Sequence, residues 1–153
     1  MSPSIEEQLQ GTCRVLETVV APCVNDPMAR TMLDGLIANL RMLTVALPAV
    51  PGFLHQDNIN TEQLLKALTN SLPADLTAQL ADVLQKPNPD PFDLAALDSR
   101  NTRLRDILAQ AVCIESLSAD QQSAIQQHMS ERASRVPMRY VPTTPPPPTT
   151  VKN

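Results

Sequence analysis

Three cysteines are the side chains of this sequence best suited to nucleophilic chemistry. Cys13, Cys23 and Cys113 are odd in number and contain no Cys-x-x-Cys pair, which argues against a disulfide framework and a zinc site. Cys13 and Cys113 fall on apolar helical stripes, where a thiol packs as a small hydrophobic group. Cys23 follows Pro22 at a helix junction, so we expect it to be exposed and the better candidate for a reactive thiol. All three thiols are expected to be free.

The two histidines offer no pattern for metal binding. His55 and His128 belong to neither a His-Glu-x-x-His nor a Glu-x-x-His motif, so both are expected to be exposed surface residues. The glycines at 11, 35 and 52 are too scattered to form a phosphate-binding loop. The sequence therefore predicts no metal, no cofactor and no catalytic site, and it favours a protein that is not an enzyme.

Asn101 is the polar residue of greatest interest, because it lies between Leu97 and Leu104 on an apolar seam. A buried amide is costly unless it is hydrogen-bonded. One interpretation is therefore an amide that fixes the register of helix packing. The alternative is a polar group that lines a Leu/Met-lined pocket or a partner surface.

Arginines gather around the same seam. Arg100, Arg103 and Arg105 are balanced by Asp98 and Asp106, which favours a solvated face crossed by ion pairs. Arg103 is nevertheless a candidate for partner contact, as is the neighbouring seam amide. The formal net charge of −4 and the aromatic content of 2% argue against nucleic-acid binding, which needs a basic surface and stacking platforms.

Residues 136–153 differ in composition from the rest of the chain. They carry the single tyrosine, Tyr140, and a run of four prolines: Pro145, Pro146, Pro147 and Pro148. Such a stretch has no face to bury and favours an extended polyproline II conformation. We predict an extended proline-rich tail. It is either a passive terminus or a short segment that docks onto another protein, with these five residues in contact.

The remaining 135 residues are predicted to be all-α. With 2% aromatic residues and three glycines, the chain lacks the usual material of β-sheets. Local signals at Ser4–Glu7, Asp26-Pro27, Asp90-Pro91 and Ser118–Gln121 are typical of helix starts. Residues 1–135 are thus expected to form one bundle of five or six helices, with a loop at 48–59, a helix beginning at Asn60 or Thr61, and a long helix over about 92–115.

Nothing in the sequence suggests export or a membrane span. The N-terminus lacks the basic and apolar regions of a secretory signal, and no uninterrupted apolar run reaches about 18 residues. We therefore expect a cytoplasmic protein.

Four segments carry a family resemblance: Val15–Pro22, Asp26–Leu33, Leu40–Leu43 and Leu97–Arg105. They resemble small helical bacterial proteins that accompany phosphotransferase-like kinases and acyl-CoA dehydrogenases in acid catabolism. The resemblance covers about a third of the chain and leaves out the proline tail. It implies an accessory subunit without its own active site, whose partner is a phosphotransferase-like or acyl-CoA-metabolising enzyme.

These observations lead to two hypotheses about function. The first is a non-catalytic accessory or adaptor protein that acts by protein–protein interaction, through helix packing and the tail. The alternative is a helical bundle that binds or converts a small molecule in a Leu/Met-lined pocket. Neither the partner nor homo-oligomerisation is specified by the sequence.

Overall fold

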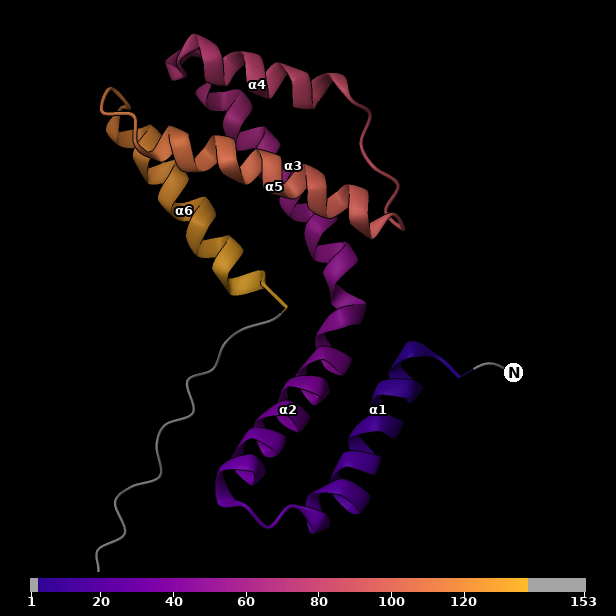
Figure 1. Cartoon of the computed structure of the whole chain (residues 1–153). Coiled ribbons are helices and arrows are strands. Elements are labelled where there is room, and N and C mark those ends of the chain that lie inside the picture. Colours follow the sequence, from indigo (N-terminus) through magenta and orange to yellow (C-terminus); the bar gives the residue numbers. More distant parts are fainter. Residues whose placement is uncertain (1–2, 138–153) are drawn as a thin grey trace, which may run out of the picture.

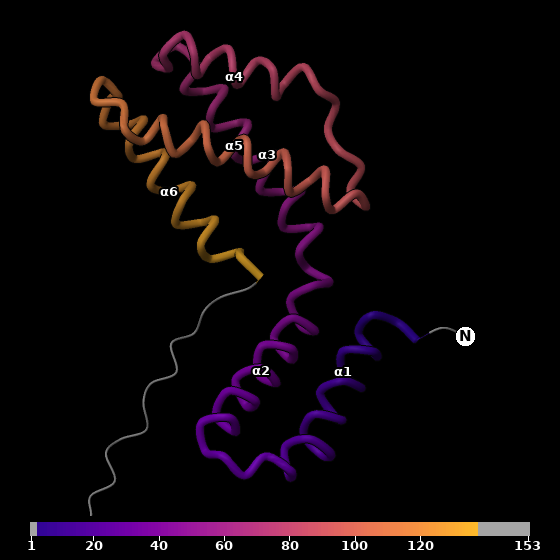
Figure 2. The backbone as a smooth tube through the Cα atoms, viewed as in Figure 1, coloured from indigo at the N-terminus to yellow at the C-terminus, as the bar shows by residue number. Residues whose placement is uncertain are grey.

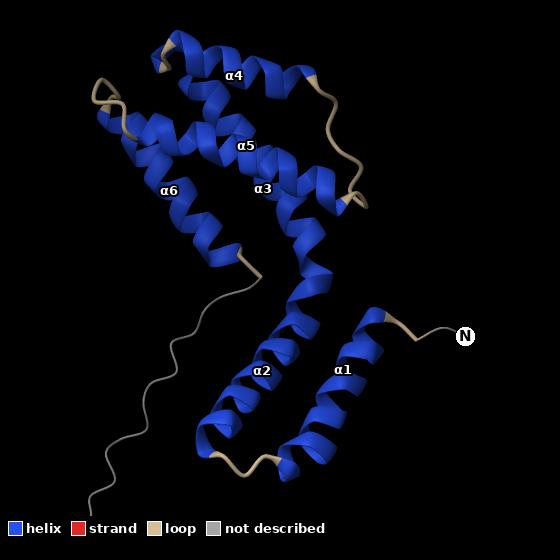
Figure 3. Cartoon of the chain, viewed as in Figure 1, coloured by secondary structure: helices blue, strands red, loops and turns tan. Residues whose placement is uncertain are grey.

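The computed structural model describes residues 3–137, and every regular element in this part of the chain is helical (Figures 1 and 3). The α-helices are α1 (Ile5–Val15), α2 (Pro27–Ala46), α3 (Val50–Leu68), α4 (Ala74–Gln85), α5 (Leu94–Val112) and α6 (Ala119–Arg135). The all-α class is confirmed. The extended form predicted for the tail stays a prediction, because residues 138–153 lie outside the described range.

Three helix starts form as their sequence signals indicate. The Ser4 hydroxyl accepts from the Glu7 backbone N–H at 3.1 Å, and the Glu7 carboxylate accepts from the Ser4 N–H at 2.7 Å. Ser118 and Gln121 make the same reciprocal pair at the start of α6. Asp26 accepts from the backbone N–H three residues ahead, at 2.8 Å. Each cap satisfies N–H groups that have no partner inside the helix.

The predicted loop over 48–59 is wrong, because these residues form one turn and the first half of α3. A single 3₁₀ turn, Leu47–Ala49, joins α2 to α3, so the two helices follow one another end to end (Figure 2). Pro51 sits in the first turn of α3, where a missing N–H costs nothing. Asn60 and Thr61 therefore lie inside α3 and do not begin it.

The start of α5 also differs from the prediction. Its N-cap is Asp93, whose carboxylate accepts from the Ala96 N–H at 3.0 Å. Asp90 instead closes a tight turn by accepting from the Phe92 N–H at 2.8 Å. The Asp-Pro pattern at residues 90–91 therefore marks a tight turn just before the helix, and not the start of the helix itself. Lys86–Pro91 is non-helical, as its prolines indicate.

The main hydrophobic core lies among α3, α4, α5 and α6. Helix α5 packs on α3 and α4, and α6 packs on α3 (Figure 1). Leucines supply most of the buried side chains, with Leu65 and Leu104 fully buried at the centre. Along α4 and α5, the buried apolar residues recur at the three- and four-residue spacing of amphipathic helices.

Helices α1 and α2 form an antiparallel pair that projects from the core, here called the hairpin (Figure 1). After Val15 the first helix continues as a π-helical turn, Leu16–Val20, and a 3₁₀ turn, Ala21–Cys23. Few side chains are buried within the hairpin: Cys13, Ala21, Ile37 and Ala46. The bundle expected over 1–135 therefore consists of a four-helix bundle, α3–α6, and a two-helix arm.

Candidate interaction surface and buried polar cluster

A cluster of buried polar side chains lies where α3, α5 and α6 meet. Asn101 is 2% exposed, and its Nδ2 donates to Asp57 Oδ2 at 2.8 Å and to Asn58 Oδ1 at 3.0 Å. Asn58 in turn donates to the Leu97 carbonyl at 3.0 Å. The buried seam amide predicted from the sequence is present. Its donors are engaged within the fold, so Asn101 stabilises the contact between α3 and α5 and presents no surface to a ligand.

Asp57 is the anionic centre of this cluster and is fully buried. Arg132 of α6 donates its Nε to Asp57 Oδ2 at 2.8 Å, and its guanidinium lies 5.5 Å from the centre of the Phe53 ring. Asp57 Oδ1 has no hydrogen-bond partner within the described residues. The carboxylate is thus held mainly through one oxygen, which accepts from both α5 and α6.

Arg100 corrects the prediction that the arginines share one solvated face. Its side chain is buried against Glu62 of α3, with Nε and Nη2 at 2.8 and 2.7 Å from the same carboxylate oxygen. Its Nη1 donates to the carbonyls of Val83 and Lys86, at 3.0 and 3.3 Å. Because Arg100 is four residues before a core leucine, it turns inward and ties α5 to α3 and to the end of α4.

Arg103 and Arg105 do behave as expected for a solvated face. Arg103 forms an ion pair with Asp82 of α4, and Arg105 is exposed. The two candidate contact residues of α5 therefore differ in burial: Arg103 lies at the surface and Asn101 in the interior. The other candidates, Tyr140 and Pro145–Pro148, lie outside the described residues.

His128 is buried on α6, which corrects the prediction of two exposed histidines; the other, His55, is half-buried. His128 Nε2 shares a hydrogen bond of 3.2 Å with the Thr61 hydroxyl. Burial lowers the pKa of His128 below its ordinary value of 6.5. Asp57 partly opposes this shift, whereas the positive charges of Arg132 and Arg135 add to it. The fold therefore favours the neutral imidazole.

This shift predicts that the protein loses stability in mild acid. As the pH falls through about 6.5, His128 in the unfolded chain binds a proton more readily than in the folded protein, so the free energy of unfolding falls. Urea unfolding between pH 7.5 and 5.5 should show the loss. His128→Gln should reduce the loss. Equal pH dependence in the wild type and His128→Gln would contradict the prediction.

The sequence reasoning missed Asp57, Glu62 and Arg132. A signal was available for Asp57, because Leu54 and Leu65 flank Asp57, Asn58 and Thr61 at helical spacing, as Leu97 and Leu104 flank Asn101. The interpretation of residues 48–59 as a loop hid this pattern.

The cysteines are free, and two of the three burial expectations hold. Cys13 is buried between α1 and α2, and Cys23 is exposed. Cys113 is exposed, contrary to the prediction, because α5 ends one residue before it. Within residues 3–137, no group of three or more histidine, cysteine or acidic side chains is arranged to hold a metal ion.

The hairpin has two different sides, as its helical spacing shows. Helix α2 turns Leu33, Ile37, Leu40 and Thr44 toward α1. Since each residue advances about 100° around a helix, the residues one position earlier share one side and those one position later share the other. The earlier residues are Met32, Leu36, Asn39 and Leu43; the later ones are Asp34, Ala38, Arg41 and Val45.

Helix α1 and its extension repeat this division. Thr12 and Val20 come one position before the buried Cys13 and Ala21, and Arg14 comes one position after Cys13. In an antiparallel pair, the earlier positions of both helices fall on the same side. The groove on the opposite side confirms the assignment, since its lining comes from Gln10, Cys13, Arg14, Glu17, Arg41, Thr44 and Val45. Glu17 and Arg41 form an ion pair across it.

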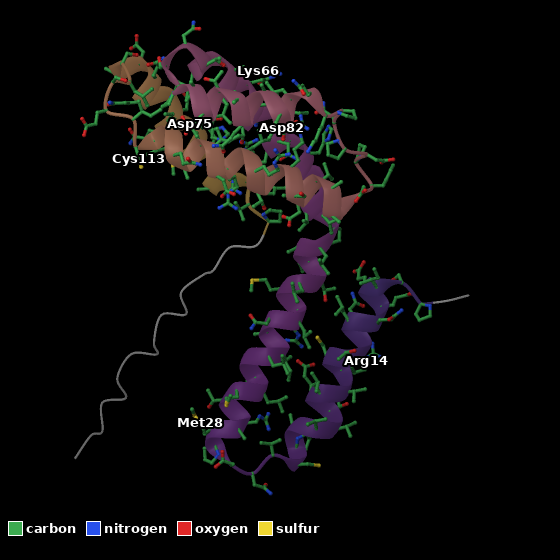
Figure 4. The ribbon with its side chains drawn as sticks, turned by 45° about the horizontal axis from the view of Figure 1, so that its top comes forward. Arg14, Met28, Lys66, Asp75, Asp82 and Cys113 are labelled. Carbon is green, nitrogen blue, oxygen red and sulfur yellow. The ribbon has the colours of Figure 1, made fainter. Side chains whose placement is uncertain are left out.

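We call the first side the apolar face: Ile5, Thr12 and Val20 of the first helix and its extension, with Met28, Met32, Leu36, Asn39 and Leu43 of α2. Met28, labelled in Figure 4, lies near the bend of the hairpin, far from the bundle. Ile5 is 72% exposed and Met28 and Met32 are each 69% exposed. The face contains no charged side chain. Such a concentration of exposed apolar groups marks a surface for association.

The stretch Pro27–Ser71 is long and apolar enough to cross a membrane by length and composition, with a mean hydropathy of 1.4 over 18 residues. The expectation of no spanning segment rested on an uninterrupted apolar run, which this window does not require. The hydropathy arises partly from the apolar face, and helices that pack against protein meet the same criterion.

No family model, curated protein or solved structure matches the chain.

Proposed function

We propose that this chain is a non-catalytic accessory or adaptor protein of the cytoplasm, which acts by protein–protein contact through the apolar face of its hairpin. The observation that carries the proposal is the exposure of that face. Met28 and Met32 lie in one row on α2, on a side of this helix that no other described element covers. Apolar area left in contact with water is a source of binding free energy, at roughly 25 cal/mol per Å².

The form of the surface indicates the kind of partner. Two helices side by side present ridges and grooves, which pack well against other helices. The polar cluster in the bundle serves this role as a scaffold, since Asn101 and Arg100 are engaged in bonds between helices. Asn101 is therefore not part of the proposed contact surface, whereas Arg103 remains a candidate at the surface of the bundle.

The resemblance to bacterial accessory proteins supports a more specific partner. It suggests a phosphotransferase-like or acyl-CoA-metabolising enzyme, for which this chain would be a subunit without chemistry of its own. In this proposal the tail, with Tyr140 and Pro145–Pro148, supplies a second contact.

The proposal predicts that one substitution on the apolar face abolishes partner capture. Met32→Lys places a charge in the middle of the face and should reduce the amount of the specific co-purified partner at least tenfold. Val45→Lys is the matched control, because Val45 is 81% exposed on the other side of the same helix. Quantitative mass spectrometry of proteins captured by the wild type and both variants measures the effect.

Two results would contradict this proposal. One is a captured partner that is retained equally by Met32→Lys and the wild type, which would place the interface elsewhere. The other is a loss with both variants alike, which would show a general sensitivity of α2 to lysine. Circular dichroism should show the same helical content for all three proteins.

A further inference from the structure

The hairpin is too thin to stand alone as a packed unit. Its interior consists of one layer of contacts between two helices, and Cys13, Ala21, Ile37 and Ala46 are its only buried apolar side chains among the described residues. Stable helical packing generally needs three or four helices around a core. The apolar face is the side on which a further layer would complete that core.

One polar residue of the face can pair with its own copy. Asn39 is its single amide, and it lies between Leu36 and Leu43 in the α2 row. A carboxamide both donates and accepts, so two copies can pair with each other across a two-fold axis. In parallel coiled coils a paired asparagine in an apolar seam fixes the register and the number of helices. In an antiparallel pair, equivalent residues meet only where the two-fold axis crosses the seam, so the pairing requires the axis to pass through Asn39.

The surface next to Asn39 is hollowed. A shallow cavity over Gly35 is lined by Met32, Leu33, Gly35, Leu36 and Asn39, and nothing lies within 4 Å of the point where a Gly35 side chain would begin. A leucine or methionine from a facing α2 can enter such a space as a knob enters a hole. The same row thus offers both the projecting side chains and the space to receive them.

Size and charge also agree with a second copy. A face about 30 Å long and two helices wide covers on the order of 600 Å². This approaches the roughly 800 Å² that each partner contributes to a standard interface. Because the face carries no charge, two copies bring no like charges together. The charged residues of α2, Arg30, Asp34 and Arg41, lie on the other side and stay solvated.

We infer that two copies of this chain associate through their apolar faces and form an antiparallel four-helix bundle, with the two Asn39 side chains paired at its centre. This inference rests on the proposed function and refines it: the occupant of the apolar face is a second copy, and another protein then binds the dimer and not the single chain. A two-fold axis at Asn39 places the α3–α6 bundles at opposite ends. The assembly would then be a bivalent scaffold with two identical bundles.

The mass of the full-length protein in solution tests the inference. Light scattering after size exclusion, over 5–200 µM protein, should give about twice the 16.7 kDa chain mass. Met32→Lys should shift the protein to monomer or weaken the dimer at least tenfold, whereas Val45→Lys should remain dimeric. A monomeric wild type throughout this range overturns the inference, as does a dimer that Met32→Lys leaves intact.

A cross-linking experiment tests the position of the axis. In a background where the exposed thiols are removed, Cys23→Ser and Cys113→Ser, the substitution Asn39→Cys should give a disulfide-linked dimer upon mild oxidation. Val45→Cys in the same background should give no disulfide-linked dimer. Cross-linking at 45 and not at 39 would place the contact on the polar side and overturn the inference.

Other occupants of the face give distinct results. If uncharged phosphatidylcholine vesicles bind the wild type but not Met32→Lys, and the free protein is monomeric, the face meets lipid and both proposals fail. If the wild type is monomeric but captures a partner that Met32→Lys loses, the inferred dimer fails while the proposed function stands.

Discussion

Arg100→Ala is expected to lower the free energy of unfolding by about 3–5 kcal/mol, the usual cost of removing one partner of a buried ion pair. The loss leaves the Glu62 carboxylate buried without its counterion and frees the carbonyls of Val83 and Lys86. Urea unfolding followed by circular dichroism at pH 7.5, at a fixed protein concentration, measures it.

Arg103→Ala is the matched control for this prediction. It removes the same side chain from the same helix, but its partner Asp82 is exposed, so we expect a cost several times smaller than that of Arg100→Ala. If the two variants proved equally stable, Arg100 would not be the tie between helices that its contacts indicate. The pair therefore separates a buried from a solvated arginine three positions apart.

Leu104→Ala is expected to be about as costly, at roughly 2–5 kcal/mol, because it opens a cavity in a packed core. Leu104 is 0% exposed and lies at the centre of the α3–α6 bundle. Leu94→Ala, at the exposed start of the same helix, should change stability by no more than about 0.5 kcal/mol. Thermal and urea unfolding of the two variants provide the comparison. A cost at Leu104 as small as that at Leu94 would mean that the core repacks around the missing atoms.

The parts of the fold that follow from local chemistry were predictable. Two capping boxes each determine a helix start within four residues, so no tertiary information is needed: Ser4 with Glu7, and Ser118 with Gln121. The turn at 47–49 was not predictable in this way. Pro48 and Pro51 are as compatible with a loop as with the first turn of a new helix, and only the packing of α3 favours the helix.

The candidate site residues show the same difference between local and long-range signals. Asn101 was identified from its seam position, since a polar residue between leucines needs a partner wherever the helix packs. Arg100 was assigned to the surface because nearby aspartates balance its charge, and His128 because it belongs to no metal-binding motif. Their actual partners, Glu62 and Thr61, lie 38 and 67 residues away in the sequence, so no local pattern reveals them. In the sequence, the apolar residues of α2 form one broad stripe at helical spacing. Its division into a covered and an uncovered part depends on how many helices surround it.

The junction between α2 and α3 can act as a hinge for the hairpin. Pro48 and Pro51 place two residues without a backbone N–H within one turn, so the helical hydrogen bonding is weakest there. Beyond this joint, the 20 residues of α2 extend for about 30 Å, so a pivot of about 10° would move the far end by about 5 Å. Small adjustments at one turn can thus align the whole arm with whatever covers it, while the packing of α3–α6 stays unchanged.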